Sequence, residues 1–167
     1  MQFEFKTLSL DAVPRALEKA VRYRLLNEPS EAESICLDAL EVDPDNQEAI
    51  TTLLLALTDQ FDHDQTTVRR AMDTASRLND EYERQYYKGL IYERRAKALL
   101  RNRAPRGAPR AYEWLREAMA CYESAEAIRP ENNDDAILRW NACARLIMSD
   151  SHLAPGVEEP REPLLSE

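Results

Sequence analysis

Glycine is scarce in this sequence, with three residues in a chain of 167. Because glycine breaks helices and permits tight turns, its scarcity disfavours a protein built on short strands and favours long helices. Long apolar runs are lacking too, since none approaches the roughly 18 residues that span a bilayer. We therefore expect a helical protein without a membrane partner.

Groups suited to catalysis or metal binding are also few. The three cysteines are scattered and odd in number, which predicts reduced core thiols (Cys36, Cys121 and Cys143). His63 and His152 stand singly, and nothing completes a metal shell around the sequence DHD that contains His63. No Walker, GxGxxG, GxSxG or CxxC motif occurs. We expect no enzyme activity, no catalytic residues, no metal and no cofactor.

A secretory signal is missing as well. The opening, MQFEFKTLSL, has neither a basic region nor an apolar core, so we expect a cytoplasmic location. The net charge of −9 disfavours general attraction to nucleic acid or anionic lipid. The balance of 44% hydrophobic and 32% charged residues is typical of a folded domain.

Helical periodicity is the main positive signal, because apolar residues recur three and four positions apart. Asp11 is placed to cap a first helix. Ser30 with Glu33, and then Asp45 with Glu48, have the spacing of capping boxes. The pattern predicts helices at 12–26, 31–43, 46–60, 65–78, 81–102, 110–128 and 134–148.

These helices predict a three-part organisation: an arm at 1–10, a repeat domain at 11–149 and a flexible, acidic, proline-rich tail at 150–167. In the arm, Phe3 and Phe5 alternate with polar residues, which is typical of extended chain. Two fates remain open for the arm: packing over a helix hairpin, or strand exchange with another subunit.

An internal repeat gives more detail. Intervals of four, three and five residues occur twice between similar residue types (Ala32, Cys36, Ala39 and Pro44; Ala118, Tyr122, Ala125 and Pro130). Ala20, Leu54 and Gly89 follow one another after 34 and 35 residues, the period of a helix-turn-helix repeat. Small residues let two helices approach closely, and a large residue fills the space beside them.

In these segments the sequence resembles the tetratricopeptide repeat family, through "ALEKAVRYRLL...EAESICLDALEVDPDN" and "YYKGLIYERRA...EAMACYESAEAIRPEN". The resemblance covers residues 13–148; it is weaker in the second unit, and no unit begins with the family's usual tryptophan. It implies an all-α, right-handed solenoid of three helix hairpins closed by a C-terminal capping helix. It also implies a non-catalytic adaptor that binds a partner protein segment in a concave groove.

The third unit is 17 residues longer than the first. Tyr23 and Ala32 are 9 residues apart, whereas the corresponding Tyr92 and Ala118 are 26 apart. The segment 94–116, which contains the extra residues, has eight basic residues and one acidic residue. We therefore expect an elongated third hairpin with a basic tip.

The family register implies which side chains line the concave groove. Those residues are Leu17, Val21, Arg24, Thr51, Leu55, Thr58, Tyr86, Leu90, Arg94, Ile137 and Asn141. Apolar, hydroxyl and aromatic groups of this kind suit a peptide with apolar anchors. The alternative is that the leucines Leu17, Leu55 and Leu90 belong to the core. In the capping helix we expect Trp140 to face inward and Arg139 outward.

The basic hairpin is a second candidate surface, formed by Arg95, Lys97, Arg101, Arg103, Arg106 and Arg110. Its arginines can pair with the chain's own acidic surface, dock an acidic protein partner, or bind nucleic acid or another anionic ligand. Nucleic acid is disfavoured because Tyr112 and Trp114 are the only aromatics there. The alternatives to an adaptor are such an anion binder or a mainly self-assembling subunit, and a monomer or weak homo-oligomer is expected.

Overall fold

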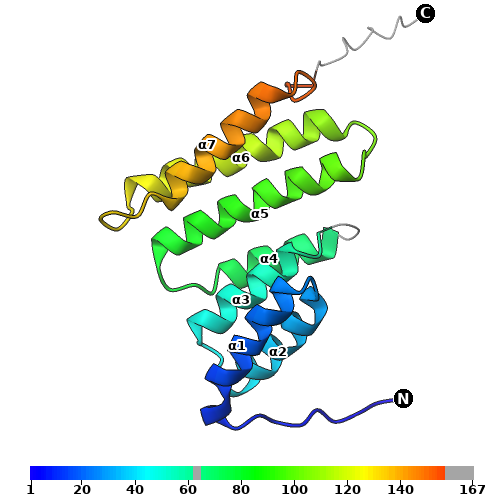
Figure 1. Ribbon diagram of the computed structural model, residues 1–167, viewed down its shortest axis with the longest axis vertical. Helices are drawn as coiled ribbons and strands as arrows, with labels where there is room; N and C mark the ends of the chain where they lie inside the picture. Colours follow the sequence, from blue (N-terminus) through cyan, green and yellow to red (C-terminus); the bar gives the residue numbers. More distant parts are fainter. Residues whose placement is uncertain (62–64, 157–167) are drawn as a thin grey trace, which may run out of the picture.

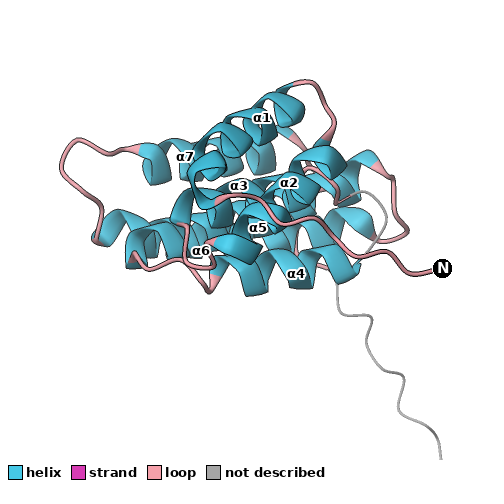
Figure 2. Ribbon diagram, turned by 90° about the horizontal axis from the view of Figure 1, so that it is seen from below, coloured by secondary structure: helices cyan, strands magenta, loops and turns pink. Residues whose placement is uncertain are grey.

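The computed structural model describes residues 1–61 and 65–156. Within these residues the chain contains helices and loops and no strand, which confirms the predicted all-helical class (Figure 1, Figure 2). The elements are η1 (Leu10–Ala12), α1 (Val13–Leu25), α2 (Pro29–Val42), α3 (Gln47–Thr58), α4 (Gln65–Ala75), α5 (Glu81–Arg101), α6 (Gly107–Ala127) and α7 (Asp135–Ser149). None of these helices is long and apolar enough to cross a membrane.

The helix boundaries lie within a few residues of the predicted ones, but the caps differ. Asp11 lies inside η1 and does not cap α1. Helix α2 begins at Pro29, whose missing N–H is tolerated in a first turn, so Ser30 lies inside the helix. Helix α3 is capped one residue later than predicted, by Asn46, which accepts a hydrogen bond from the Ala49 backbone N–H at 2.9 Å. The predicted caps at Asp11 and Ser30 are therefore wrong.

Consecutive helices pack against one another along the chain (Figure 1). Helices α5 and α6 have 21 residues each, whereas α1 and α2 have 13 and 14. The hairpin of α5 and α6 is therefore elongated, as the inserted segment predicts. In Figure 2, α1 and α7 lie on one side of the molecule, and α4 and α6 on the other.

The repeated small residues mark close helix contacts. Ala20, Leu54 and Gly89 are all buried. A Cβ added to Gly89 would lie 2.8 Å from Cε1 of the Tyr122 ring and 3.2 Å from the Ala118 carbonyl oxygen. Only glycine at this position lets α5 approach α6 so closely.

The core consists of two clusters that share α5. One cluster lies among α1 to α4 and includes Leu54 and Phe61. The other lies among α5, α6 and α7 and includes Leu115 and Tyr122. Helix α5 sends Ile91 to the first cluster and Leu99, Ala96 and Tyr82 to the second. It is therefore the element that joins the two parts of the molecule.

The segments before α1 and after α7 differ in burial. Phe3 and Phe5 are 77% and 93% exposed, so the arm does not pack over a helix hairpin, contrary to the first of the two predicted fates. At the other end, Leu153 is 4% exposed and belongs to the second core cluster, although it follows the predicted domain boundary at 149. The predicted tail from residue 157 onward lies outside the described residues.

Candidate functional site

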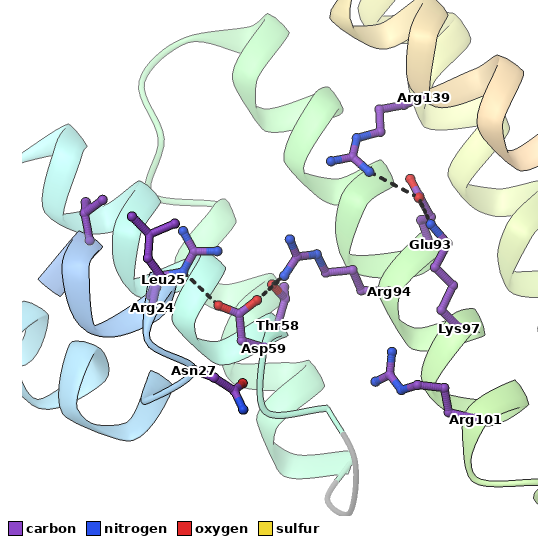
Figure 3. Close-up of a pocket in the computed structure, with 11 residues that line it drawn as sticks. Arg24, Leu25, Asn27, Thr58, Asp59, Glu93, Arg94, Lys97, Arg101 and Arg139 are labelled. Atoms are coloured by element: carbon purple, nitrogen blue, oxygen red, sulfur yellow. Dashed lines mark hydrogen bonds and ion pairs between the residues drawn. The ribbon is translucent and has the colours of Figure 1, made fainter.

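A groove of about 560 Å³ separates α1 and the end of α3 from α5 and α7 (Figure 3). Its lining comes from four helices that are distant in the sequence, and most of it is polar. The lining residues are Val21, Arg24, Leu25, Asn27, Thr58, Asp59, Glu93, Arg94, Lys97, Arg101 and Arg139.

Asp59 organises the side of the groove nearest α1. The Arg24 Nε donates a hydrogen bond to Asp59 Oδ2 at 2.8 Å. Arg94 from α5 also pairs with Asp59, and its Nη1 donates to the Thr58 hydroxyl at 2.9 Å. Because Asp59 follows the last turn of α3, where a negative charge opposes the helix dipole, the two guanidinium groups offset an otherwise unfavourable position.

Glu93 organises the opposite side. Its side chain is 1% exposed, and it accepts hydrogen bonds from the Tyr122 hydroxyl at 2.6 Å, Lys97 Nζ at 2.5 Å and Arg139 Nη1 at 3.3 Å. Burial alone raises the pKa of Glu93, but the hydrogen bonds from Lys97 and Tyr122 and the charges of Lys97 and Arg139 outweigh burial and hold the pKa below its usual value. The buried carboxylate is therefore ionised and fixes the two cations at the groove wall.

The groove is cationic on an acidic protein. Among the described residues that line it, five side chains are cationic and two are carboxylates, Asp59 and Glu93, which gives these residues a net charge of +3 (Arg24, Arg94, Lys97, Arg101 and Arg139). The whole chain has a net charge of −9. A concave site that gathers positive charge on an otherwise negative protein attracts anionic groups and orients them on approach.

The end of α1 supplies an apolar edge. Val21 and Leu25 line the groove and are 39% and 82% exposed. The helix stops here because Asn27 adopts a left-handed backbone with a φ of 60°, a conformation that asparagine tolerates. The Asn27 and Glu28 backbone N–H groups donate to the carbonyls of Arg24 at 3.0 Å and Tyr23 at 2.8 Å, which closes the helix end.

The structure brings together part of the predicted groove. Four of the predicted residues line it, namely Val21, Arg24, Thr58 and Arg94. Leu17 and Leu90 do not, because they are 1% and 2% exposed within the core; for these two the core alternative is right. Others are partly buried at positions outside the groove lining, namely Thr51, Leu55, Tyr86, Ile137 and Asn141.

The predicted basic hairpin is divided by the fold. Lys97 and Arg101 line the groove, so the two predicted surfaces are continuous. The other basic residues do not line it: Arg95 is partly buried within α5, whereas the arginines at and beside the hairpin tip are exposed (Arg103, Arg106 and Arg110). Burial, followed by the charge of Arg110, lowers the pKa of Arg95. Trp114 stacks on Tyr92 with ring centroids 5.2 Å apart, so this ring already has a partner within the hairpin.

Sequence reasoning missed five groove residues: Leu25, Asn27, Asp59, Glu93 and Arg139. The prediction that Arg139 faces outward is wrong, because it bonds Glu93 of α5 on the same wall of the groove. Trp140 is partly buried and donates from Nε1 to Glu123 at 2.9 Å. The spacing of Glu93 and Lys97, four residues apart, was the one local signal of a pair.

Among residues 1–61 and 65–156, no group of three or more histidine, cysteine or acidic residues is placed to hold a metal, and His63 lies outside these residues. The three cysteines are free and buried, as predicted (Cys36, Cys121 and Cys143). Burial raises the pKa of Cys36 and Cys143 to about 12, so these thiols stay protonated at neutral pH.

Comparisons of the chain with protein-family models, with curated proteins and with solved structures find no match. The tetratricopeptide resemblance thus depends on the residue pattern alone.

Proposed function

We propose that this protein is a non-catalytic adaptor, with tetratricopeptide-like hairpins, that binds an acidic segment of a partner protein in the cationic groove. The observation that carries the proposal is the net charge of +3 among the described residues that line a groove built by α1, α3, α5 and α7, on a protein of net charge −9. In this proposal the three hairpins form a right-handed stack, and α7 is its terminal cap.

The groove chemistry favours carboxylates. A guanidinium group presents several N–H donors in a fixed plane and can hold a carboxylate through two of them. Arg24 and Arg94 are already oriented by Asp59, and Arg139 by Glu93, so less side-chain freedom is lost when a ligand binds. A few acidic side chains of an extended or helical segment suit a groove of about 560 Å³.

The apolar edge adds a second requirement. Val21 and Leu25 offer exposed aliphatic surface next to Arg24. A partner segment that places an apolar side chain beside its acidic residues satisfies both parts of the groove at once.

The exposed tip arginines favour a second candidate, nucleic-acid binding at the α5–α6 tip. Arg103 and Arg106 are exposed there. Stacking support is limited, because Trp114 is engaged by Tyr92. Affinity for an unrelated RNA that falls steeply as salt rises from about 50 to 200 mM would favour this candidate.

Peptide selection tests the proposal. A random peptide display library is selected on the immobilised full chain, and the best peptide is measured by fluorescence anisotropy. We expect acidic sequences with an apolar residue, weakened about five- to ten-fold by Arg101→Glu in the groove and less than about two-fold by Arg106→Glu at the tip. The two variants change net charge equally. Selected peptides that are basic, or that lose more affinity with Arg106→Glu, would reject the groove as the site.

A further inference from the structure

The N-terminal arm exposes an unusual amount of apolar surface. Residues 1–9 form no helix or strand, and Met1, Phe3 and Phe5 are 112%, 77% and 93% exposed. In Figure 1 the arm leaves the start of α1 at the end of the molecule opposite α7. A phenylalanine ring normally buries 150–250 Å² of surface, so exposed rings on one short segment indicate a surface that another body covers.

An apolar notch lies at the base of this arm, between α1 and α2. It has a volume of about 270 Å³ and an apolar floor formed by Leu8, Ala12, Ala16 and Ile35. Its rim is charged and carries Arg15, Lys19 and Asp38. The notch is of a size and character that suit one aromatic side chain.

We propose that two copies of this chain exchange their arms, each placing an arm phenylalanine in the notch of the other. Because Leu8 lines the notch and also lies at the base of the arm, a two-fold axis beside the notch lets both arms cross by the same path. The arm's own notch is a poor target, since Phe5 is three residues before Leu8 and no turn interrupts residues 1–9 to reverse the chain.

The charges on arm and rim agree with this exchange. Glu4 lies between the two phenylalanines, and the rim presents Arg15 and Lys19 as its partners. Lys6 follows Phe5, and the rim presents Asp38. Opposite charges at the edge of an apolar contact fix its register and exclude wrong partners.

Sedimentation of the full chain measures the exchange. We expect a monomer–dimer equilibrium over about 1–500 µM, with a dissociation constant raised at least about ten-fold by Phe3→Ser with Phe5→Ser. Gln2→Ser with Thr7→Ser is the matched control and should leave the dissociation constant unchanged. All four positions are exposed, so circular dichroism should not change. A chain that stays monomeric over this range, or a double phenylalanine variant that dimerises like the natural chain, would overturn the proposal.

Disulfide trapping tests which copy supplies the notch. Phe5→Cys on one copy and Lys19→Cys on another should form a linked dimer when mixed and oxidised, because Lys19 lines the notch. Glu18→Cys is the control, since Glu18 is an exposed neighbour that does not line it. Equal yields of linked dimer with the Lys19→Cys and Glu18→Cys partners would overturn the proposal. So would a doubly substituted chain, Phe5→Cys with Lys19→Cys, that forms its disulfide only within one copy. Either outcome leaves the groove proposal unaffected.

Discussion

Glu93 joins three helices through one buried carboxylate. It belongs to α5 and accepts hydrogen bonds from Tyr122 of α6 and Arg139 of α7, as well as from Lys97 one turn along its own helix. A buried charge is tolerated only when it is paired and hydrogen-bonded. The stability of the second core therefore depends on the ionised form of this residue.

Glu93→Gln should lower the free energy of unfolding by about 1.5–3 kcal/mol at pH 7, because Lys97 and Arg139 lose their shared negative partner. Since the folded pKa of Glu93 lies below its ordinary value of 4.5, its contribution is full above that value and is lost as the pH falls through the folded pKa. The difference between the two proteins should therefore shrink in acid. Urea unfolding measures this difference at each pH.

Glu117→Gln on the exposed face of α6 serves as the control for Glu93→Gln and should change stability by less than about 0.5 kcal/mol. A difference between the Glu93 variant and the natural chain that grew in acid would contradict the ionised pairing.

Gly89→Ala should destabilise the protein by about 1–3 kcal/mol, although alanine favours helices more than glycine does. The added Cβ would lie 2.8 Å from the Tyr122 ring, which is fully buried and is held by the hydrogen bond from its hydroxyl to Glu93. Thermal unfolding measures whether Gly89→Ala lowers or raises the stability. Gly156→Ala, whose Cβ would lie 3.6 Å from Pro109 Cβ, should be nearly neutral. A stabilised Gly89→Ala variant would show that α5 and α6 are not in such close contact.

At the scale of elements, the α5–α6 hairpin closes through two arginines in left-handed backbone. Arg103 and Arg106 have φ values of 46° and 54°. Backbone N–H groups of Arg103 and Ala104 donate to the carbonyls of Leu100 at 3.3 Å and Leu99 at 3.4 Å, so the helix end is satisfied despite the strain. The basic tip thus retains arginine where glycine would fit with less strain.

Arg106→Gly should raise the free energy of unfolding by about 0.5–1 kcal/mol, since the relief of left-handed strain exceeds the entropy that glycine loses on folding. Arg110→Gly, three residues inside α6, should lower it by a similar amount because helical glycine is unfavourable. Chemical denaturation compares the two. If both variants changed stability in the same direction, the assigned backbone at Arg106 would be wrong.

Asp59→Asn separates the structural and the binding roles of the groove. Asp59 links α1, α3 and α5 through Arg24 and Arg94 at partly exposed positions, so its loss should cost about 1 kcal/mol of stability. The same change raises the net charge of the groove by one, so a selected acidic peptide should bind several-fold more tightly at low salt. Calorimetry and anisotropy report the two effects. A parallel loss of stability and affinity would indicate that Asp59 only supports the shape of the groove.

At the scale of the whole molecule, the features that could be predicted are those that a short stretch of sequence determines. The seven helices of residues 1–61 and 65–156 were predictable because apolar periodicity and prolines act over a few residues. The elongated hairpin was predictable because the 17 extra residues interrupt a repeat. The helix caps were harder to predict, because the neighbouring residues Ser30 and Asp45 suit these positions as well as Pro29 and Asn46 do.

The groove was only partly predictable, because its pairs join distant residues. Arg94 and Asp59 are 35 residues apart, and Arg139 and Glu93 are 46 apart. An arginine on a polar helix face has the same local pattern whether it meets solvent or a carboxylate of another helix. The packing of α5 between the two core clusters decides which of its polar side chains meet a partner on another helix.

The most direct measurement of the central claim is a nuclear magnetic resonance titration of the isotope-labelled full chain with the selected acidic peptide. If the groove binds it, the largest shift changes will fall on residues of all four lining helices, including Val21, Thr58, Lys97 and Arg139. Changes confined to the tip around Arg103 and Arg106, with the groove residues unmoved, would contradict it.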